Sequence, residues 1–509
     1  MKRAANRTPE DENDIQALVR TGFDGLGCQL LLLRIEDRAR ARAWLRDLIP
    51  RLTRFNQVGD GKRVGDGLQM ALTAAGLGKL ELDGDVLKQF PDEFLTGLAD
   101  DPSRLRRLGD IGDNDPVHWS WGTGDRVPHV LLIQYDQPHQ VETAAKELAE
   151  AAAANGLSVM ENFDTGRTHE DEPKEPFGFR DGLSQPSIDW QDTRASDSGA
   201  DMAFHNLIAP GEIVLGYPNE YGLYTERPLL KEAVPGAGAL PLAADQPGLH
   251  DLGRNGSFLV YRQLHQDVCG FWRWLHQEAG NYGDAVTLAE AMLGRQMDGK
   301  PFAGLGTTSI PGIAPPKNPD KPRNDFLYST DRSGQVCPIG AHIRRANPRT
   351  GDYPQGRMGL IKKLLALLGL TGSPERDHIA STRFHRLLRR GRKYGESPSP
   401  AEAAKPDTPS PHTGLHFLCL NANLVRQFEF VQGAWMASAK FAGMTGEQDP
   451  MLGNRQPFPG TQETDRFSRP QSAGPCKVSR AVPQFVRVRG GAYFFLPGLR
   501  ALTWLLAER

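Results

Sequence analysis

Apolar runs of strand length alternate with helical repeats through the first third of the chain. Cys28–Ile35 (CQLLLLRI) is a continuous apolar run that predicts a buried strand, and Ala39–Ile49 carries its apolar residues at helical spacing and ends before Pro50. Strands are also predicted over Leu68–Leu72, His129–Tyr135 and Leu157–Phe163, and helices over Phe90–Leu98 and Val141–Ala154. With Phe90–Leu98 as an extra helix, the order is β-α-β-β-α-β, that of a ferredoxin-like sandwich with an antiparallel sheet.

A similar order returns in the second half of the chain, with long insertions. The predicted strands are Ser257–Gln263, Arg383–Arg390, Leu415–Leu420 and Phe485–Leu496, and the predicted helices are His265–Glu278 and Asn421–Ser438. We therefore expect an α+β protein of two ferredoxin-like units, with an N-terminal domain over residues 1–200 and a C-terminal domain over residues 201–509.

The insertions have the composition of loops. Pro311–Asn324 and Glu396–Pro411 are rich in proline, which favours irregular or partly mobile structure. Between them, Met358–Leu370 has the pattern of an amphipathic helix. It is too short for a membrane anchor and has only two lysines, so we expect it to pack on its own domain.

Charge and cysteine content exclude several classes of protein. The formal net charge of the 509 residues is −2, so no overall field favours nucleic acid or an anionic membrane. The first residues lack the apolar core of a secretory signal, and no run approaches the roughly 20 apolar residues of a membrane span. Five widely spaced cysteines include no zinc or c-type haem motif. We expect a cytoplasmic protein.

One histidine lies among arginines in Val336–Arg349 (VCPIGAHIRRANPR). A neutral imidazole such as that of His342 is a good ligand for haem iron, and haem propionates need cations near the ring edge. Arg344, Arg345 and Arg349 are the candidates for those cations. Taken alone, however, His342 is one of 13 histidines and fits a hydrogen-bonded core residue equally well.

Two further segments carry candidate chemistry. In Glu175–Pro186 (EPFGFRDGLSQP), Asp181 precedes a glycine, which by itself indicates only a turn. In Arg383–Gly395, strand alternation sends neighbouring side chains to opposite faces, so Arg389 could face a pocket while Arg390 points away. A basic edge strand exposed to solvent is the alternative for that segment.

Taken together and in this order, the three segments support a functional interpretation that none of them supports alone. GFRDG (178–182), AHIRRANPR (341–349) and HRLLRRGRKYG (385–395) together resemble the pattern of the dye-decolorizing peroxidase family. The resemblance extends from DIQALVRTGF (14–23) to RVRGGAYFFLPGLRAL (487–502), nearly the whole chain. It implies two ferredoxin-like units of the dimeric α+β barrel type, with one non-covalent haem b per chain in the C-terminal unit.

The resemblance also implies a role for each segment. His342 would bind the haem iron, and Asp181 and Arg389 would cleave hydrogen peroxide on the opposite side, giving an oxoferryl intermediate that oxidises dyes, phenolics or other reductants. Arg389 follows His342 by 47 residues because Thr350–Asp377 is inserted, which resembles the members with extended loops. Arg386 and Arg390 therefore remain alternatives for the distal arginine.

Further residues are assigned by their position relative to these segments. Glu429 is the candidate carboxylate partner of His342, with a solvated helix residue as the alternative. Leu415 and Phe417 share one strand face and could line the haem pocket or simply pack in the core. Tyr394 matches a position where members of the family can carry an oxidisable surface tyrosine, with Trp190 and the Trp119/Trp121 pair as weaker candidates.

Other functions on the same fold stay open at this point. A chlorite-decomposing or haem-dechelating enzyme would also bind haem, as would a carrier or sensor without turnover. The Asp181/Arg389 pair favours peroxide cleavage over these. The sequence does not distinguish a monomer from a homodimer.

Overall fold

A computed structural model describes residues 7–59, 65–165, 174–191, 207–305, 324, 326, 328, 331–349, 381–457, 464–471 and 474–508. Across these ranges, no helix is long and apolar enough to cross a membrane. The predicted domain boundary at residue 200, the helix predicted over Met358–Leu370 and nearly all of Pro311–Asn324 lie outside them.

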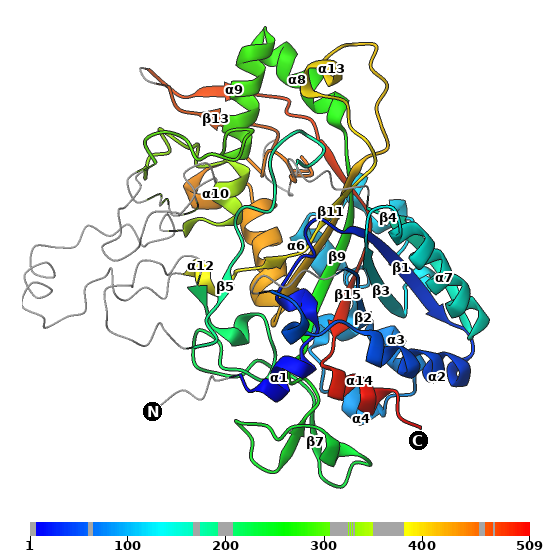
Figure 1. The fold of residues 1–509 in the computed structure, drawn as a ribbon. Coiled ribbons are helices and arrows are strands. Elements are labelled where there is room, and N and C mark those ends of the chain that lie inside the picture. Colours follow the sequence, from blue (N-terminus) through cyan, green and yellow to red (C-terminus); the bar gives the residue numbers. More distant parts are fainter. Residues whose placement is uncertain are drawn as a thin grey trace, which may run out of the picture.

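The N-terminal unit follows the predicted order closely (Figure 1). Its elements are β1 (Gly27–Ile35), α2 (Arg38–Leu48), β2 (Gly67–Leu72), β3 (Val130–Asp136), α7 (Val141–Ala154) and β4 (Leu157–Asp164). The strands lie in the order β2-β3-β1-β4, and every pair is antiparallel. The short helices α3 (Ala74–Lys79), α4 (Gly84–Leu87), α5 (Asp92–Thr96) and α6 (Pro102–Leu108) come between β2 and β3, with α5 inside the predicted extra helix.

The C-terminal unit repeats this arrangement with interruptions. It contains β9 (Ser257–Gln266), α8 (Val268–Ala279), α9 (Tyr282–Leu293), β10 (Leu388–Arg389), β11 (Arg392–Tyr394), β12 (Gly414–Asn421), two π-helical stretches (Val425–Glu429 and Val431–Met436) and β15 (Val486–Leu496). Its strands lie in the order β10-β12-β9-β15, the counterpart of β2-β3-β1-β4. The prediction of two ferredoxin-like units is therefore confirmed.

The remaining described helices and strands are short. They are α1 (Pro9–Asp14), β5 (Ser187–Ile188), β6 (Leu207–Ile208), β7 (Leu229–Lys231), β8 (Leu249–Asp251), α10 (His342–Ala346), α12 (Ser381–Phe384), α13 (Pro400–Ala403), β13 (Phe467–Arg469), β14 (Lys477–Ser479) and α14 (Leu499–Leu505).

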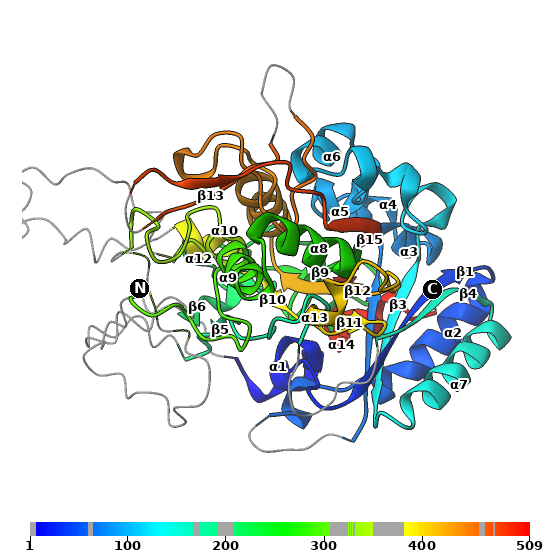
Figure 2. The same ribbon diagram turned by 90° about the horizontal axis from the view of Figure 1, so that it is seen from above.

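A single strand contact joins the two units into one sheet. Phe495 of β15 pairs with Leu72 of β2, so the edge strands of both units meet and nine strands become continuous. Successive side chains of a strand point to opposite faces. Leu30 and Leu32 accordingly pack in a core layer shared by both halves of the sheet, whereas Leu31 and Leu33 pack against the helices. Figure 2 shows α2 and α7 on that outer side.

The predicted barrel type needs a correction. Among the described strands, β4 at one end of the sheet pairs with neither β10 nor β11 at the other, so no barrel closes. The two ends meet through side chains instead: the rings of Phe163 on β4 and His416 on β12 lie 5.0 Å apart. The sheet therefore folds over an apolar layer and stays open along one seam.

Two predicted elements differ in the C-terminal unit. The strand predicted over Arg383–Arg390 contains the end of α12 and only the two-residue β10, because the carbonyl of Arg386 accepts from the Gln427 side chain (2.7 Å) instead of entering a ladder. The helix predicted over Asn421–Ser438 is wound as two π-helical stretches, a form that recurs at functional sites.

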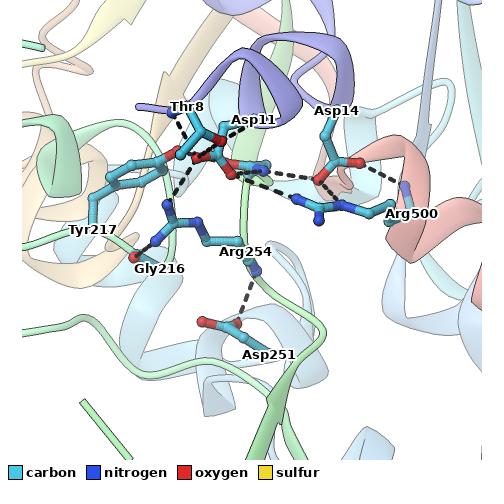
Figure 3. A network of polar contacts seen from close by, with 9 residues as sticks. Thr8, Asp11, Asp14, Gly216, Tyr217, Asp251, Arg254 and Arg500 are labelled. Atoms are coloured by element: carbon cyan, nitrogen blue, oxygen red, sulfur yellow. Dashed lines mark hydrogen bonds and ion pairs between the residues drawn. The ribbon is translucent and has the colours of Figure 1, made fainter. Parts of the chain in front are cut away.

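A buried polar network ties the N-terminal helix α1 to the segment before β9 and to α14 (Figure 3). Asn255 donates to both Asp11 and Asp14 at 2.8 Å. Arg254 donates to Asp11 at 3.2 Å, and the backbone amide of Arg500 donates to Asp14 at 2.6 Å. The two carboxylates thus fasten α1 to α14 and to the segment that leads into β9.

This network makes a prediction about stability. Burial alone would raise the pKa of Asp11, but hydrogen bonds from Asn255 and Thr8 and the charge of Arg254 lower it to about 2. A carboxyl with a depressed pKa stabilises the fold above its unfolded pKa and loses that effect as the pH falls toward the folded value. Asp11→Asn should therefore lower the free energy of unfolding by about 2 kcal/mol at neutral pH, and by less below pH about 4.

Urea denaturation at several pH values measures this effect. Glu10→Gln, at an exposed position of the same helix, is the matched control and should leave the free energy of unfolding unchanged. An Asp11→Asn effect that did not shrink in acid would show that the carboxylate charge is not the source of the stabilisation.

Candidate active site

A cavity lies on the outer face of the C-terminal half of the sheet. Its floor is formed by alternate residues of the central strands, namely Arg262 and Leu264 of β9, Leu415 and Phe417 of β12, and Val486 and Val488 of β15. The π-helical segment and α10 form one side, and the loop that carries GFRDG forms another. The predicted pocket residues Leu415 and Phe417 therefore do line a cavity.

His342 is the first residue of α10 and lines this cavity. Its Nδ1 lies 3.1 Å from both carboxylate oxygens of Asp449, which is fully buried. The amides of Met451 and Leu452 donate to the same carboxylate at 2.9 and 2.8 Å. This geometry fixes the imidazole plane and leaves Nε2 as the ring nitrogen that can bind a ligand in the cavity.

The His342–Asp449 pair is strongly coupled. Burial alone would lower the pKa of His342, but the charge and hydrogen bond of Asp449 raise it above its ordinary value. Burial would raise the pKa of Asp449, but His342 and the nearby guanidinium of Arg345 lower it. The Asp449 carboxylate consequently stays ionised and accepts a hydrogen bond from Nδ1 of His342.

The prediction that Glu429 is the partner of His342 is wrong. The Glu429 carboxylate lies 2.8 Å from Arg104 Nε and accepts from the Tyr493 hydroxyl at 3.0 Å. The π-helical winding sets the side chain of Glu429 toward α6 and β15. Nothing in the sequence singled out Asp449 among the 62 acidic residues of the chain.

Asp181 and Arg389 meet at the same cavity. Arg389 NH1 lies 3.3 Å from Asp181 Oδ1, and the two side chains are 34% and 46% exposed. The Arg389 amide also donates to Gln185 Oε1 at 3.0 Å, which links β10 to the loop that carries Asp181. Arg390 instead donates to the carbonyls of Leu18 and Val19. Arg386 lines the cavity as well, so it stays a second cation there.

A partly buried carboxylate holds the GFRDG loop in place. Glu175 accepts from the amides of Phe177 and Phe179, both at 3.0 Å, and from the Gln266 side chain at 2.8 Å. Burial raises the pKa of Glu175 to about 7 against the effect of these donors. Glu175, which the sequence did not single out, therefore anchors to β9 the turn that presents Asp181.

The arginines predicted to meet a cofactor have other partners. Arg344 binds Asp331 (3.0 Å), Arg345 donates to the carbonyls of Trp435 (2.8 Å) and Glu447 (2.7 Å), and Arg349 donates to the carbonyl of Phe326 (2.8 Å). All three are buried, and none is among the described residues that line the cavity. They support the His342 segment from behind, so the prediction that they bind the cofactor is not supported.

Other polar groups line the cavity instead. Its cations are Arg180, Arg262, Arg295, Arg386 and Arg389. Asn347, on the same segment as His342, has both side-chain amide atoms buried without a hydrogen-bond partner among the described residues. An amide in a cavity wall can donate to and accept from a polar group of a ligand or from water.

The candidate relay residue Tyr394 lies inside the protein rather than at its surface. Its side chain is 5% exposed, and its hydroxyl donates to the carbonyl of Leu264 at 3.2 Å. Trp119 and Trp121 are also buried, whereas Trp190 is partly exposed. A bulky substrate therefore cannot touch Tyr394 directly, and that part of the prediction is wrong.

Comparison with known proteins adds sequence and fold relatives. No family model matches the chain. A multifunctional dye peroxidase of an Amycolatopsis species is 29% identical over 78% of this chain and 75% of its own length. A dye-decolorizing peroxidase of Mycetinis scorodonius is 26% identical over 97% of this chain and 87% of its own length.

Solved structures with the same fold cover almost all of the chain. A fungal DyP-type peroxidase from Auricularia auricula-judae superposes with a TM-score of 0.70 at 23% identity, covering 98% of this chain and 100% of its own. A DyP-type peroxidase of an Anabaena species gives a TM-score of 0.68 at 19% identity, covering 98% and 95%. In sequence over most of its length, and in fold, the chain is therefore similar to dye-decolorizing peroxidases.

Proposed function

We propose that the chain is a haem peroxidase that reduces hydrogen peroxide and oxidises dyes, phenolics or similar electron donors. One observation supports this proposal most strongly: a single cavity is lined by His342, whose imidazole is hydrogen-bonded to Asp449, and by the Asp181–Arg389 pair. The imidazole suits iron ligation, and the pair suits proton transfer and charge stabilisation. The family relatives act on dyes by their printed names, which supports the same substrate class here.

The residues of the cavity fit a non-covalent haem b, one per chain. His342 Nε2 would bind the iron, and Leu415, Phe417 and Phe428 offer apolar surface to a macrocycle. Arg386 and the unpartnered amide of Asn347 would receive its carboxylates, in place of the arginines first assigned to them. Haem would supply the iron that reacts with peroxide and the oxidising power passed on to the reducing substrate.

The chain's own groups would handle the proton and the charge. The Asp181 carboxylate accepts a proton from one oxygen of hydrogen peroxide and returns it to the other, which leaves as water. Arg389 stabilises the negative charge that develops on the departing oxygen. Glu175 keeps Asp181 in place through the loop amides, and the Gln185 contact holds Arg389 to the same loop.

Stopped-flow absorption after peroxide addition tests this assignment. Asp181→Ala should slow the conversion of the Soret band by about 10²–10⁴-fold, because the proton carrier is lost while haem stays bound. Arg389→Leu should slow it by about 10²–10³-fold, since charge stabilisation is lost. Asp113→Ala removes an exposed carboxylate that also pairs with an arginine, Arg487, and is the matched control.

The outcomes separate the proposal from its alternatives. Unchanged rates in Asp181→Ala and Arg389→Leu would leave haem binding in place and exclude these residues from peroxide cleavage. A Soret band of the wild type that does not change after peroxide addition would favour a haem carrier or sensor without turnover. Release of iron or conversion of chlorite would favour the dechelating or chlorite-decomposing alternatives.

Asp449 gives a second prediction. A carboxylate that accepts from Nδ1 makes the imidazole a stronger electron donor, so Asp449→Asn should raise the Fe(III)/Fe(II) midpoint potential and weaken haem binding about 10–100-fold. Spectroelectrochemical titration measures the potential. Glu429→Gln alters the buried carboxylate that does not contact His342, and it should keep the wild-type potential. Equal shifts of the midpoint potential in the two variants would show that Asp449 has no specific effect on the haem iron.

A further inference from the structure

A hydrogen-bonded tyrosine–histidine pair lies between the two halves of the sheet. The hydroxyl oxygen of Tyr261 on β9 is 2.9 Å from Nδ1 of His416 on the adjacent strand β12. Tyr261 is fully buried and His416 is 1% exposed. His416 lies between Leu415 and Phe417, whose side chains face the cavity, so the His416 ring lies on the opposite face of the same strand, directly behind the cavity floor.

Both partners of this pair are neutral. Burial raises the pKa of the Tyr261 phenol well above its ordinary value, which keeps its proton in place. Burial lowers the pKa of His416 to about 3, which keeps the imidazole uncharged. In the tautomer of the neutral imidazole that carries its hydrogen on Nε2, Nδ1 accepts from the phenol.

Oxidisable rings surround the pair. The ring of Trp121 lies 4.7 Å from that of Tyr261, and the ring of Tyr394 lies 4.7 Å from that of His416. Beyond Tyr394, the exposed His412 has its ring centre at 5.5 Å. Aromatic side chains thus continue from the core layer behind the cavity floor to the protein surface.

Loss of an electron makes a phenol strongly acidic, so a buried tyrosine is oxidised only where a base can take its proton. Tyr261 has such a base at hydrogen-bond distance. Tyr394 donates to a carbonyl and Tyr217 to the Asn255 amide, and neither acceptor can hold a proton. Tyr493 donates to Glu429, but that carboxylate is already paired with Arg104.

We propose that Tyr261 and His416 form a redox-active pair that takes up an oxidising equivalent from the peroxide-oxidised cofactor when no reductant is present. One electron passes from Tyr261 to the cofactor, the O–H bond of the phenol breaks, and the proton moves to Nδ1 of His416. The product is a neutral tyrosyl radical beside an imidazolium. A later reductant returns the electron, and the proton goes back to the phenol. This inference rests on the proposed peroxidase function.

Electron paramagnetic resonance of the haem-loaded protein tests the pair. Samples are frozen after stoichiometric peroxide without reductant, and absorption spectra of the same samples report oxidation of the cofactor. The wild type should give a tyrosyl radical, and Tyr261→Phe should lose it while its cofactor is still oxidised. Tyr135→Phe is the matched control, because Tyr135 is a buried tyrosine of the same core layer whose hydroxyl lies beside the Cys28 thiol and not beside an imidazole.

A second variant isolates the base. His416→Gln keeps a hydrogen-bond acceptor but cannot take the proton, so it should also lose the radical, and it serves alone if Tyr261→Phe fails to fold. A wild-type radical yield in either variant overturns the inference, whether the signal then belongs to Tyr493, Tyr394 or another residue. Absorption that peroxide leaves unchanged refutes the proposed function instead, so the two failures are distinct.

Discussion

The hydrogen bond between His342 and Asp449 fixes the centre around which the rest of the site is built. It joins the first turn of α10 to a loop 107 residues further along the chain, where the carboxylate is fully buried. Two backbone amides and the charge of Arg345 stabilise the carboxylate, so the imidazole has a fixed plane and a fixed free nitrogen. The arginines that follow His342 in sequence keep this geometry by binding backbone carbonyls.

The two faces of the C-terminal half of the sheet carry different functional residues. Outer-face residues of β9, β12 and β15 form the floor of the cavity, whereas inner-face residues of the same strands pack between the two units. Because side chains alternate along a strand, Tyr261 and Arg262 are neighbours in sequence and serve different layers. The open seam of the sheet brings Phe163 against His416, so the N-terminal unit helps to bury the tyrosine–histidine pair.

The order of helices and strands along the chain and the order of the three motif segments could be predicted from the sequence, because both rest on local patterns. Asp181, His342 and Arg389 each lie in such a segment, and all three line one cavity. Asp449, Glu175 and the Tyr261–His416 pair could not be found this way, since each depends on contacts between segments far apart in the chain. The prediction that the arginines beside His342 bind the cofactor failed for the same reason. They are close to His342 in sequence, but successive side chains of a short helix point in different directions.

Titration of ferric haem into the apoprotein tests the central assignment most directly. The wild type should take up one haem per chain, with the absorption spectrum of imidazole-ligated iron. His342→Gly should lose that spectrum, and added imidazole should restore it by filling the space left in front of Asp449. A His342→Gly protein that binds haem with the wild-type spectrum in the absence of imidazole would contradict the assignment of His342 as the ligand.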